Sequence, residues 1–128
     1  MALLNFEMRD YGKALEFLVK VRTEDFSYRL DIKLLQLKIY YEMNETESLL
    51  SLIDSYRHLL GKAKQLSDMF KNFHMNFIRY SEKLIRIRER GETDELENLK
   101  QEVLGPNVPT GKPWLLEKIE ELTNSRRG

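Results

Sequence analysis

Apolar residues recur at helical spacing along most of this chain. One run has successive separations of 4, 3, 4, 3, 4 and 3 residues: Leu66, Phe70, Phe73, Phe77, Tyr80, Leu84 and Ile87. This is the period of an amphipathic α-helix. No segment of useful length alternates apolar and polar residues with period two, so the sequence predicts no strand. We therefore expect an all-α fold.

Capping and turn residues divide this pattern into separate helices. The predicted helices cover about residues 2–8, 11–22, 28–43, 45–60, 64–90, 94–104 and 114–122. Asp10 is a suitable N-cap, and Asn44 followed by Glu47 predicts a capping box. Gly91 suits the C-terminal cap of the longest helix, and Pro113 suits the first turn of the last one. Residues 125–128 are expected to form a frayed tail.

The helix predicted at residues 28–43 is apolar on two sides. One stripe contains Leu30, Leu34, Leu37 and Tyr41, and a second contains Tyr28, Ile32, Leu35, Ile39 and Met43. A helix that is apolar on two opposite sides must pack between neighbours. Stacked helical hairpins provide that environment for their interior helices.

Three segments resemble the turns of tetratricopeptide repeats. Residues 10–15 (Asp-Tyr-Gly-Lys-Ala-Leu) resemble the turn and second-helix start of such a repeat, and residues 39–45 resemble the end of a first helix and its turn. Residues 90–96 have the same turn character. Aligning the first two segments places Leu49 at the position of Ala14, 35 residues away, close to the family period of about 34.

The chain also departs from the family pattern. Leu49 and Leu96 replace a small residue, and Leu37 stands where the family has another small residue. We therefore expect hairpins that are splayed more widely than in a regular array. The resemblance covers residues 1–104, and the helix at Trp114 is expected to be a terminal cap. Because the helix at residues 2–8 is short for a first helix, we expect the chain to be the C-terminal part of a longer protein.

The resemblance implies antiparallel helical hairpins stacked in a right-handed array with a C-terminal capping helix, as a single domain over residues 1–124. It also implies a non-catalytic interaction or scaffolding module that binds a protein or peptide partner. Carried over by alignment, the partner groove would be formed by Asp31, Leu34, Leu35, Lys38, Tyr41 and Glu42. Helical arithmetic places these six positions on one face.

Composition narrows the functional classes. Lys plus Arg and Asp plus Glu both number 21, and there is no cysteine. The balanced charge argues against binding nucleic acid or membranes over the whole surface, and the lack of cysteine excludes disulfides and thiolate sites. The uncharged run from Ser48 to Ile53 is far shorter than the ~20 residues that cross a bilayer. We expect a protein without a membrane span, located in the cytoplasm.

No motif predicts catalysis or a cofactor. The loop at residues 105–112 superficially resembles a phosphate-binding loop, but it has five residues between its glycines, and Pro113 follows its lysine. The two histidines, His58 and His74, lie on different predicted helices without metal-ligand spacing. We therefore expect no enzyme, no metal and no cofactor.

A basic stripe on the longest helix supports an alternative. Arg79, Lys83, Arg86 and Arg90 are spaced 4, 3 and 4 residues apart, so they lie on one line of the helix. A nucleic-acid backbone would bind such a line. The interpretation that we favour is internal pairing with the acidic segment that contains Asp94, Glu95, Glu97 and Glu102. A third alternative is homodimerisation through an N-terminal edge formed by Leu3, Leu4 and Met8.

Overall fold

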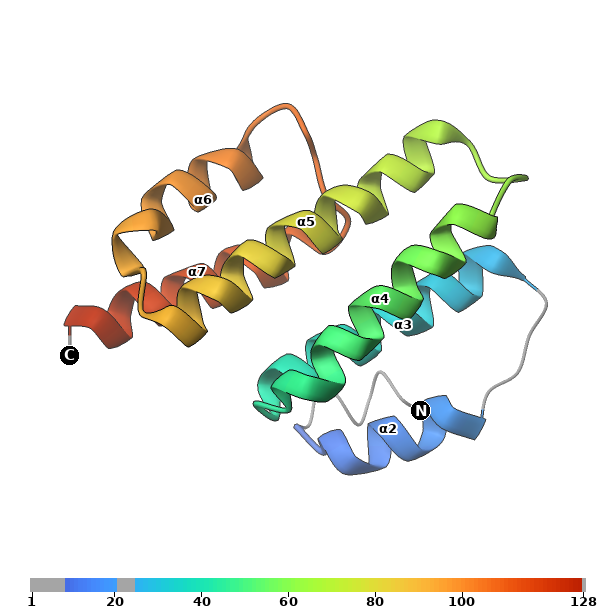
Figure 1. Cartoon of the computed structure of the whole chain (residues 1–128), viewed down its shortest axis with the longest axis horizontal. Coiled ribbons are helices and arrows are strands. Elements are labelled where there is room, and N and C mark those ends of the chain that lie inside the picture. Colours follow the sequence, from blue (N-terminus) through green and yellow to red (C-terminus); the bar gives the residue numbers. More distant parts are fainter. Residues whose placement is uncertain (1–8, 21–24, 128) are drawn as a thin grey trace. The chain divides into compact units, whose positions relative to one another are not determined.

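The computed structural model describes residues 9–20 and 25–127 (Figure 1). Its elements are α2 (Tyr11–Lys20), α3 (Phe26–Glu42), α4 (Thr46–Lys62), α5 (Asp68–Arg90), the short 3-10 helix η1 (Thr93–Glu95), α6 (Leu96–Leu104) and α7 (Lys112–Arg127). These described residues contain no strand, which confirms the all-α prediction. The helix expected at residues 2–8, with Leu3, Leu4 and Met8, lies outside the described residues.

The chain divides into two compact units, residues 1–66 and residues 67–128. The first contains α2, α3 and α4, and the second contains α5, η1, α6 and α7. Each unit has its own packed helices. The stacking of hairpins into one right-handed array and the single domain over residues 1–124 stay predictions.

In the first unit, α3 packs between α2 and α4. Ile39 of α3 and Ala14 of α2 are fully buried together, and Ile32 and Leu35 pack against them. Leu30 and Leu37 are fully buried on another side of the same helix. The two-sided apolar pattern of α3 is therefore confirmed, although Tyr28 and Met43, at the ends of the second stripe, are exposed.

The turn between α3 and α4 corrects the predicted capping box. Asn44 adopts a left-handed conformation with φ of 57°, and its N–H donates to the carbonyl of Tyr41. The N–H of Glu45 donates to the carbonyl of Tyr40. This pair of bonds is a Schellman motif, which ends a helix. Asn44 therefore closes α3 and does not cap α4, whose N-cap Glu45 makes no side-chain capping bond.

The beginnings of α3 and α5 are set by N-cap side chains. Asp25 accepts hydrogen bonds from the backbone N–H groups of Ser27 and Tyr28. Ser67 accepts one from Phe70, so α5 begins at Asp68, four residues later than predicted. The end of α5 agrees with the prediction, because Gly91 is left-handed with φ of 69° and closes the helix.

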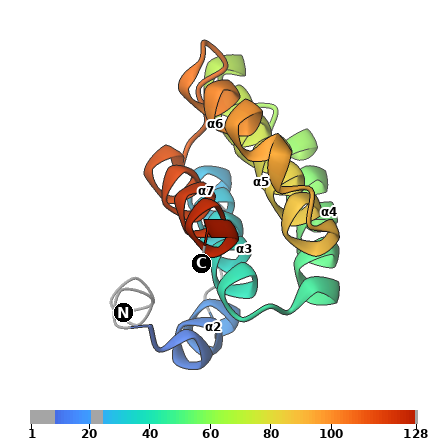
Figure 2. The same cartoon turned by 90° about the vertical axis from the view of Figure 1, so that its left-hand side faces the viewer.

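In the second unit, α5, α6 and α7 each pack against the other two (Figure 2). Helix α7 continues to Arg127, past the predicted end near Leu122, because no Gly or Pro interrupts residues 114–127. Trp114, Leu115 and Ile119 form its buried face. A lysine ordinarily lies on the solvent face of a helix, but Lys118 is only 3% exposed and pairs with Glu117 and Glu121.

Candidate functional site

The predicted partner groove on α3 is only partly open. Asp31 is exposed, and Leu34 and Lys38 are half-buried. The other three positions are used in packing or pairing: Leu35 packs against the core cluster, Tyr41 is 6% exposed, and Glu42 forms an ion pair with Arg9 at 4.0 Å. Desolvation, and to a smaller extent the charge of Asp25, raises the pKa of Asp31. The use of this face for binding stays a prediction.

A groove that the sequence pattern does not predict runs between α3 and α4. It consists of two adjoining hollows of about 490 and 500 Å³, which share Lys33 and Ser55. On α3 the lining residues are Phe26, Arg29, Lys33, Gln36 and Tyr40, and on α4 they are Glu47, Ser48, Ser51, Leu52, Asp54, Ser55, His58, Leu59 and Lys62. At about 100° per residue, the α3 line lies roughly 180° from the predicted partner groove.

Cations dominate one end of this α3–α4 groove. Lys33 is half-buried, and its pKa is lowered by burial and, to a smaller extent, by the positive charge of Arg29. In the described part of the chain, no ion pair involves Arg29, Lys33 or Lys62. Arg29 lies over the ring of Phe26, with its guanidinium carbon 5.3 Å from the ring centroid. The cationic groups of the groove are therefore available to an external anion.

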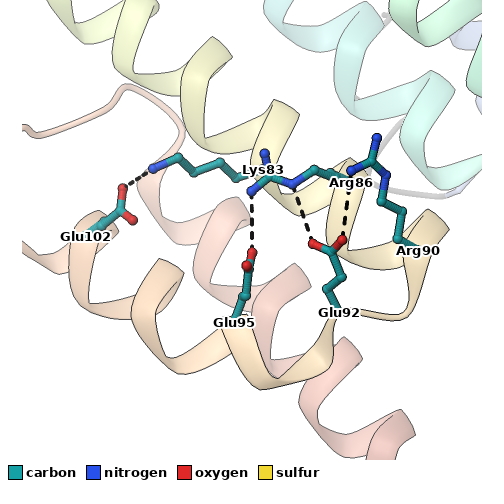
Figure 3. Close-up of polar contacts among 6 residues, drawn as sticks. All are labelled: Lys83, Arg86, Arg90, Glu92, Glu95 and Glu102. Atoms are coloured by element: carbon teal, nitrogen blue, oxygen red, sulfur yellow. Dashed lines mark hydrogen bonds and ion pairs between the residues drawn. The ribbon is translucent and has the colours of Figure 1, made fainter.

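The basic stripe of α5 is largely paired within its own unit (Figure 3). Lys83 contacts Glu102 at 2.6 Å, and Arg86 contacts Glu95 at 3.4 Å. Glu92 contacts both Arg86, at 3.6 Å, and Arg90, at 3.9 Å. Pairing by Glu95 and Glu102 was expected, whereas pairing by Glu92 was not.

The remaining stripe residues behave differently. Arg79 is exposed and takes part in no ion pair of the described residues. Glu97, which was expected to pair with the stripe, accepts a hydrogen bond from Gln101 of its own helix, and Asp94 is exposed. The sequence does not predict the role of Glu92, because this residue lies in the turn before the acidic helix. Helical periodicity gives the direction of a side chain only within a helix.

The proline-containing loop at residues 105–112 is fixed to α5. Tyr80 donates its hydroxyl to the carbonyl of Asn107 at 2.9 Å, and Asn76 donates to that of Val108 at 3.1 Å. The N–H of Thr110 donates to the carbonyl of Phe73 at 3.0 Å. This amide is therefore engaged with the protein itself, and the loop is an interhelical connection.

The histidines and the tryptophan occupy different environments. His58 is exposed, and its Nδ1 lies 2.9 Å from the carbonyl of Asp54. His74 is buried with its ring centroid 5.0 Å from that of Phe70, and burial lowers its pKa to about 4. Trp114 is buried, with its ring centroid 6.0 Å from that of Phe77, so it anchors α7. Among the described residues, no three or more His, Asp or Glu side chains gather into a possible metal site.

Comparisons with protein-family models, with curated proteins and with solved structures find no match to this chain. Within residues 9–20 and 25–127, no helix is both long enough and apolar enough to span a membrane. The surfaces with distinctive chemistry are the α3–α4 groove, the opposite face of α3, and the basic stripe of α5.

Proposed function

We propose that this chain is a non-catalytic protein–protein interaction module of tetratricopeptide-like type. The observation that supports this proposal best is the open groove along α3 and α4, two antiparallel helices joined by a three-residue turn. The resemblance of residues 10–15 and 39–45 to tetratricopeptide turns agrees with it. In helical repeats of this kind, paired helices provide extended surfaces for protein or peptide partners.

The packing of α3 makes the hairpin a suitable binding surface. Ile39 and Leu37 fix the helix on two sides, and the Schellman motif at Asn44 fixes the turn. A surface built on packed helices is already in its binding conformation, so little conformational entropy is lost when a partner binds. This property suits the recognition of a partner.

Two alternatives remain as competing proposals. A nucleic-acid-binding module would use the basic stripe, but Lys83, Arg86 and Arg90 already contact glutamates, and binding would have to replace these pairs. A homodimerisation domain would use the N-terminal edge at Leu3, Leu4 and Met8, which lies outside the described residues.

The full chain can be tested on an array of immobilised peptides of varied sequence. We expect saturable binding to a subset of the peptides. The same peptides, added in solution, should abolish this binding by competition. In parallel, binding to a twenty-nucleotide oligouridine should be weaker than to the best peptides. Tighter binding to the RNA, with affinity that falls steeply with salt concentration, would contradict the proposal. Binding to no peptide on the array would also contradict it.

A further inference from the structure

We propose that the α3–α4 groove binds an extended acidic peptide segment, with a carboxylate of the peptide paired to Lys33. This inference rests on the proposed function and names its binding surface and the chemistry of its partner. It places the partner on the face of α3 opposite to Asp31 and Lys38.

The charges of the groove support an acidic ligand. Arg29 and Lys33 are one helical turn apart on α3, and Lys62 reaches the same hollow from α4. None of the three has a carboxylate partner among the described residues. Lys33 lies at the junction of the two hollows and is already half-buried. A carboxylate bound there would pair in a partly desolvated site, where such pairs are stronger than on an open surface.

Polar groups along the floor favour a peptide backbone. Ser48, Ser51 and Ser55 lie along α4 at separations of 3 and 4 residues and face the groove. The hydroxyl of Ser55 already donates to the carbonyl of Leu52 at 3.0 Å, so Ser55 offers only an acceptor. On α3, the side chain of Gln36 lines the same hollow. Peptide N–H and C=O groups would satisfy such donors and acceptors.

The length of the groove and the residues at its ends define the length and the flanking side chains of the peptide that it can bind. The line from Phe26 to Tyr40 covers 14 residue steps, or about 21 Å at the helical rise. An extended chain covers this length with about six residues. Phe26 and Tyr40 provide half-buried aromatic surfaces at opposite ends, so apolar side chains of the partner can flank the acidic ones.

The acidic residues of the groove favour a peptide over a nucleic acid. Glu47 and Asp54 lie on the α4 side, one in each hollow. A nucleic-acid backbone has a negative charge at every nucleotide and would meet both carboxylates. A peptide can place its acidic residues beside Lys33 and Arg29 and neutral residues beside Glu47 and Asp54.

The test uses the full chain and fluorescence anisotropy with labelled eight-residue peptides. The probe peptide has two central glutamates and a phenylalanine near each end; the control peptide has glutamines instead of the glutamates. We expect the glutamate peptide to bind at least about tenfold more tightly, with affinity that falls as salt increases. A uridine octanucleotide should bind more weakly than the glutamate peptide.

Charge-reversal variants on the two faces of α3 locate the site. Lys33→Glu should weaken binding of the glutamate peptide at least about tenfold, and Lys38→Glu, on the opposite face of the same helix, should leave it unchanged. Circular dichroism melting shows whether both variants fold. As a further check, K33E should bind a peptide with two central lysines more tightly than the wild type does.

Four results would overturn the inference, and the first three are comparisons. The first is equal affinity for the glutamate and glutamine peptides. The second is a loss of binding in K38E without a loss in K33E. The third is tighter binding of the octanucleotide than of the glutamate peptide. The second result would move the partner to the opposite face and leave the proposed function intact. Absence of measurable binding of the glutamate peptide would overturn this inference alone, because the peptide array tests the proposed function separately.

Discussion

The backbone of Gly111 passes so close to Phe77 that a Cβ atom at Gly111 would lie 2.9 Å from Cε1 of the ring. Gly111 also has a φ of 69°, in the left-handed region. Glycine is therefore required at this position for two independent reasons, close approach and backbone conformation. The contact holds the start of α7 against α5, where Trp114 adds a second aromatic contact with Phe77.

We predict that Gly111→Ala destabilises the protein by about 1–3 kcal/mol, because the methyl group meets the Phe77 ring and the backbone is strained. Urea unfolding followed by circular dichroism measures the change. Gly61→Ala is the matched control, since nothing lies within 4 Å of a Cβ atom there and the residue is helical. That control should be neutral or stabilising by up to about 1 kcal/mol. Equal stability of G111A and the wild type would show that the loop does not pass over the ring.

The packing of α3 predicts a large difference between two leucines. Leu37 is fully buried, whereas Leu50 of α4 is 52% exposed. Leu37→Ala should cost about 2–5 kcal/mol, because it leaves a cavity in the core of the first unit. Leu50→Ala should cost less than about 0.5 kcal/mol. Both changes are measured by urea unfolding, and a loss below about 0.5 kcal/mol for L37A would show that α3 is a surface helix.

The sequence predicts the helices well where periodicity and caps agree. The two stripes of α3 and the left-handed Gly91 follow from residue spacing and residue type alone. Asn44 shows the limit of this reasoning, because asparagine suits both the N-cap of one helix and the left-handed end of another. The choice depends on the hydrogen bonds to Tyr40 and Tyr41, which form only once α3 has ended there.

The functional surfaces were harder to predict than the helices. The residues that line the α3–α4 groove depend on which face of α3 lies beside α4. The packing of the two helices determines that face, and the sequence of either helix alone does not. The spacing of Arg29 and Lys33 was visible in the sequence, but the lack of acidic partners was not. The charge of Lys118 favours the solvent face of α7, but its long apolar stem allows burial while its ammonium contacts Glu121 at 2.6 Å.

We predict that the glutamates paired with the basic stripe of α5 neutralise its charge and so prevent it from binding nucleic acid. Replacing Glu92, Glu95 and Glu102 together with glutamine removes the partners of Lys83, Arg86 and Arg90. Stability should fall only modestly, since exposed ion pairs contribute about 0–1 kcal/mol each. Affinity for oligouridine should rise by about tenfold or more, with a steeper salt dependence. Filter binding at several salt concentrations measures both quantities. Equal affinity of the variant and the wild type would mean that the glutamates do not mask the stripe.

Because His74 is buried, we predict that the protein loses stability in mildly acidic solution. Its side chain is buried in α5, and burial lowers its pKa from the ordinary value of 6.5 to about 4. A histidine with a lowered pKa stays neutral in the folded protein while it becomes protonated in the unfolded chain. Below about pH 6.5 the unfolded chain therefore binds more protons, and the free energy of unfolding falls as the pH falls towards 4.

Between pH 7 and pH 5, this difference in protonation should lower the free energy of unfolding by about 1–2 kcal/mol. Urea unfolding at half-unit pH intervals measures the profile, and that range avoids most of the titration of the carboxylates. His74→Gln has no ring to protonate, so its profile should be nearly flat over the same range even if its stability at pH 7 is lower. His58→Gln changes an exposed histidine and should keep the slope of the wild type. If H74Q retained that slope, another group would be responsible, and His74 would have to be accessible to solvent in the folded protein.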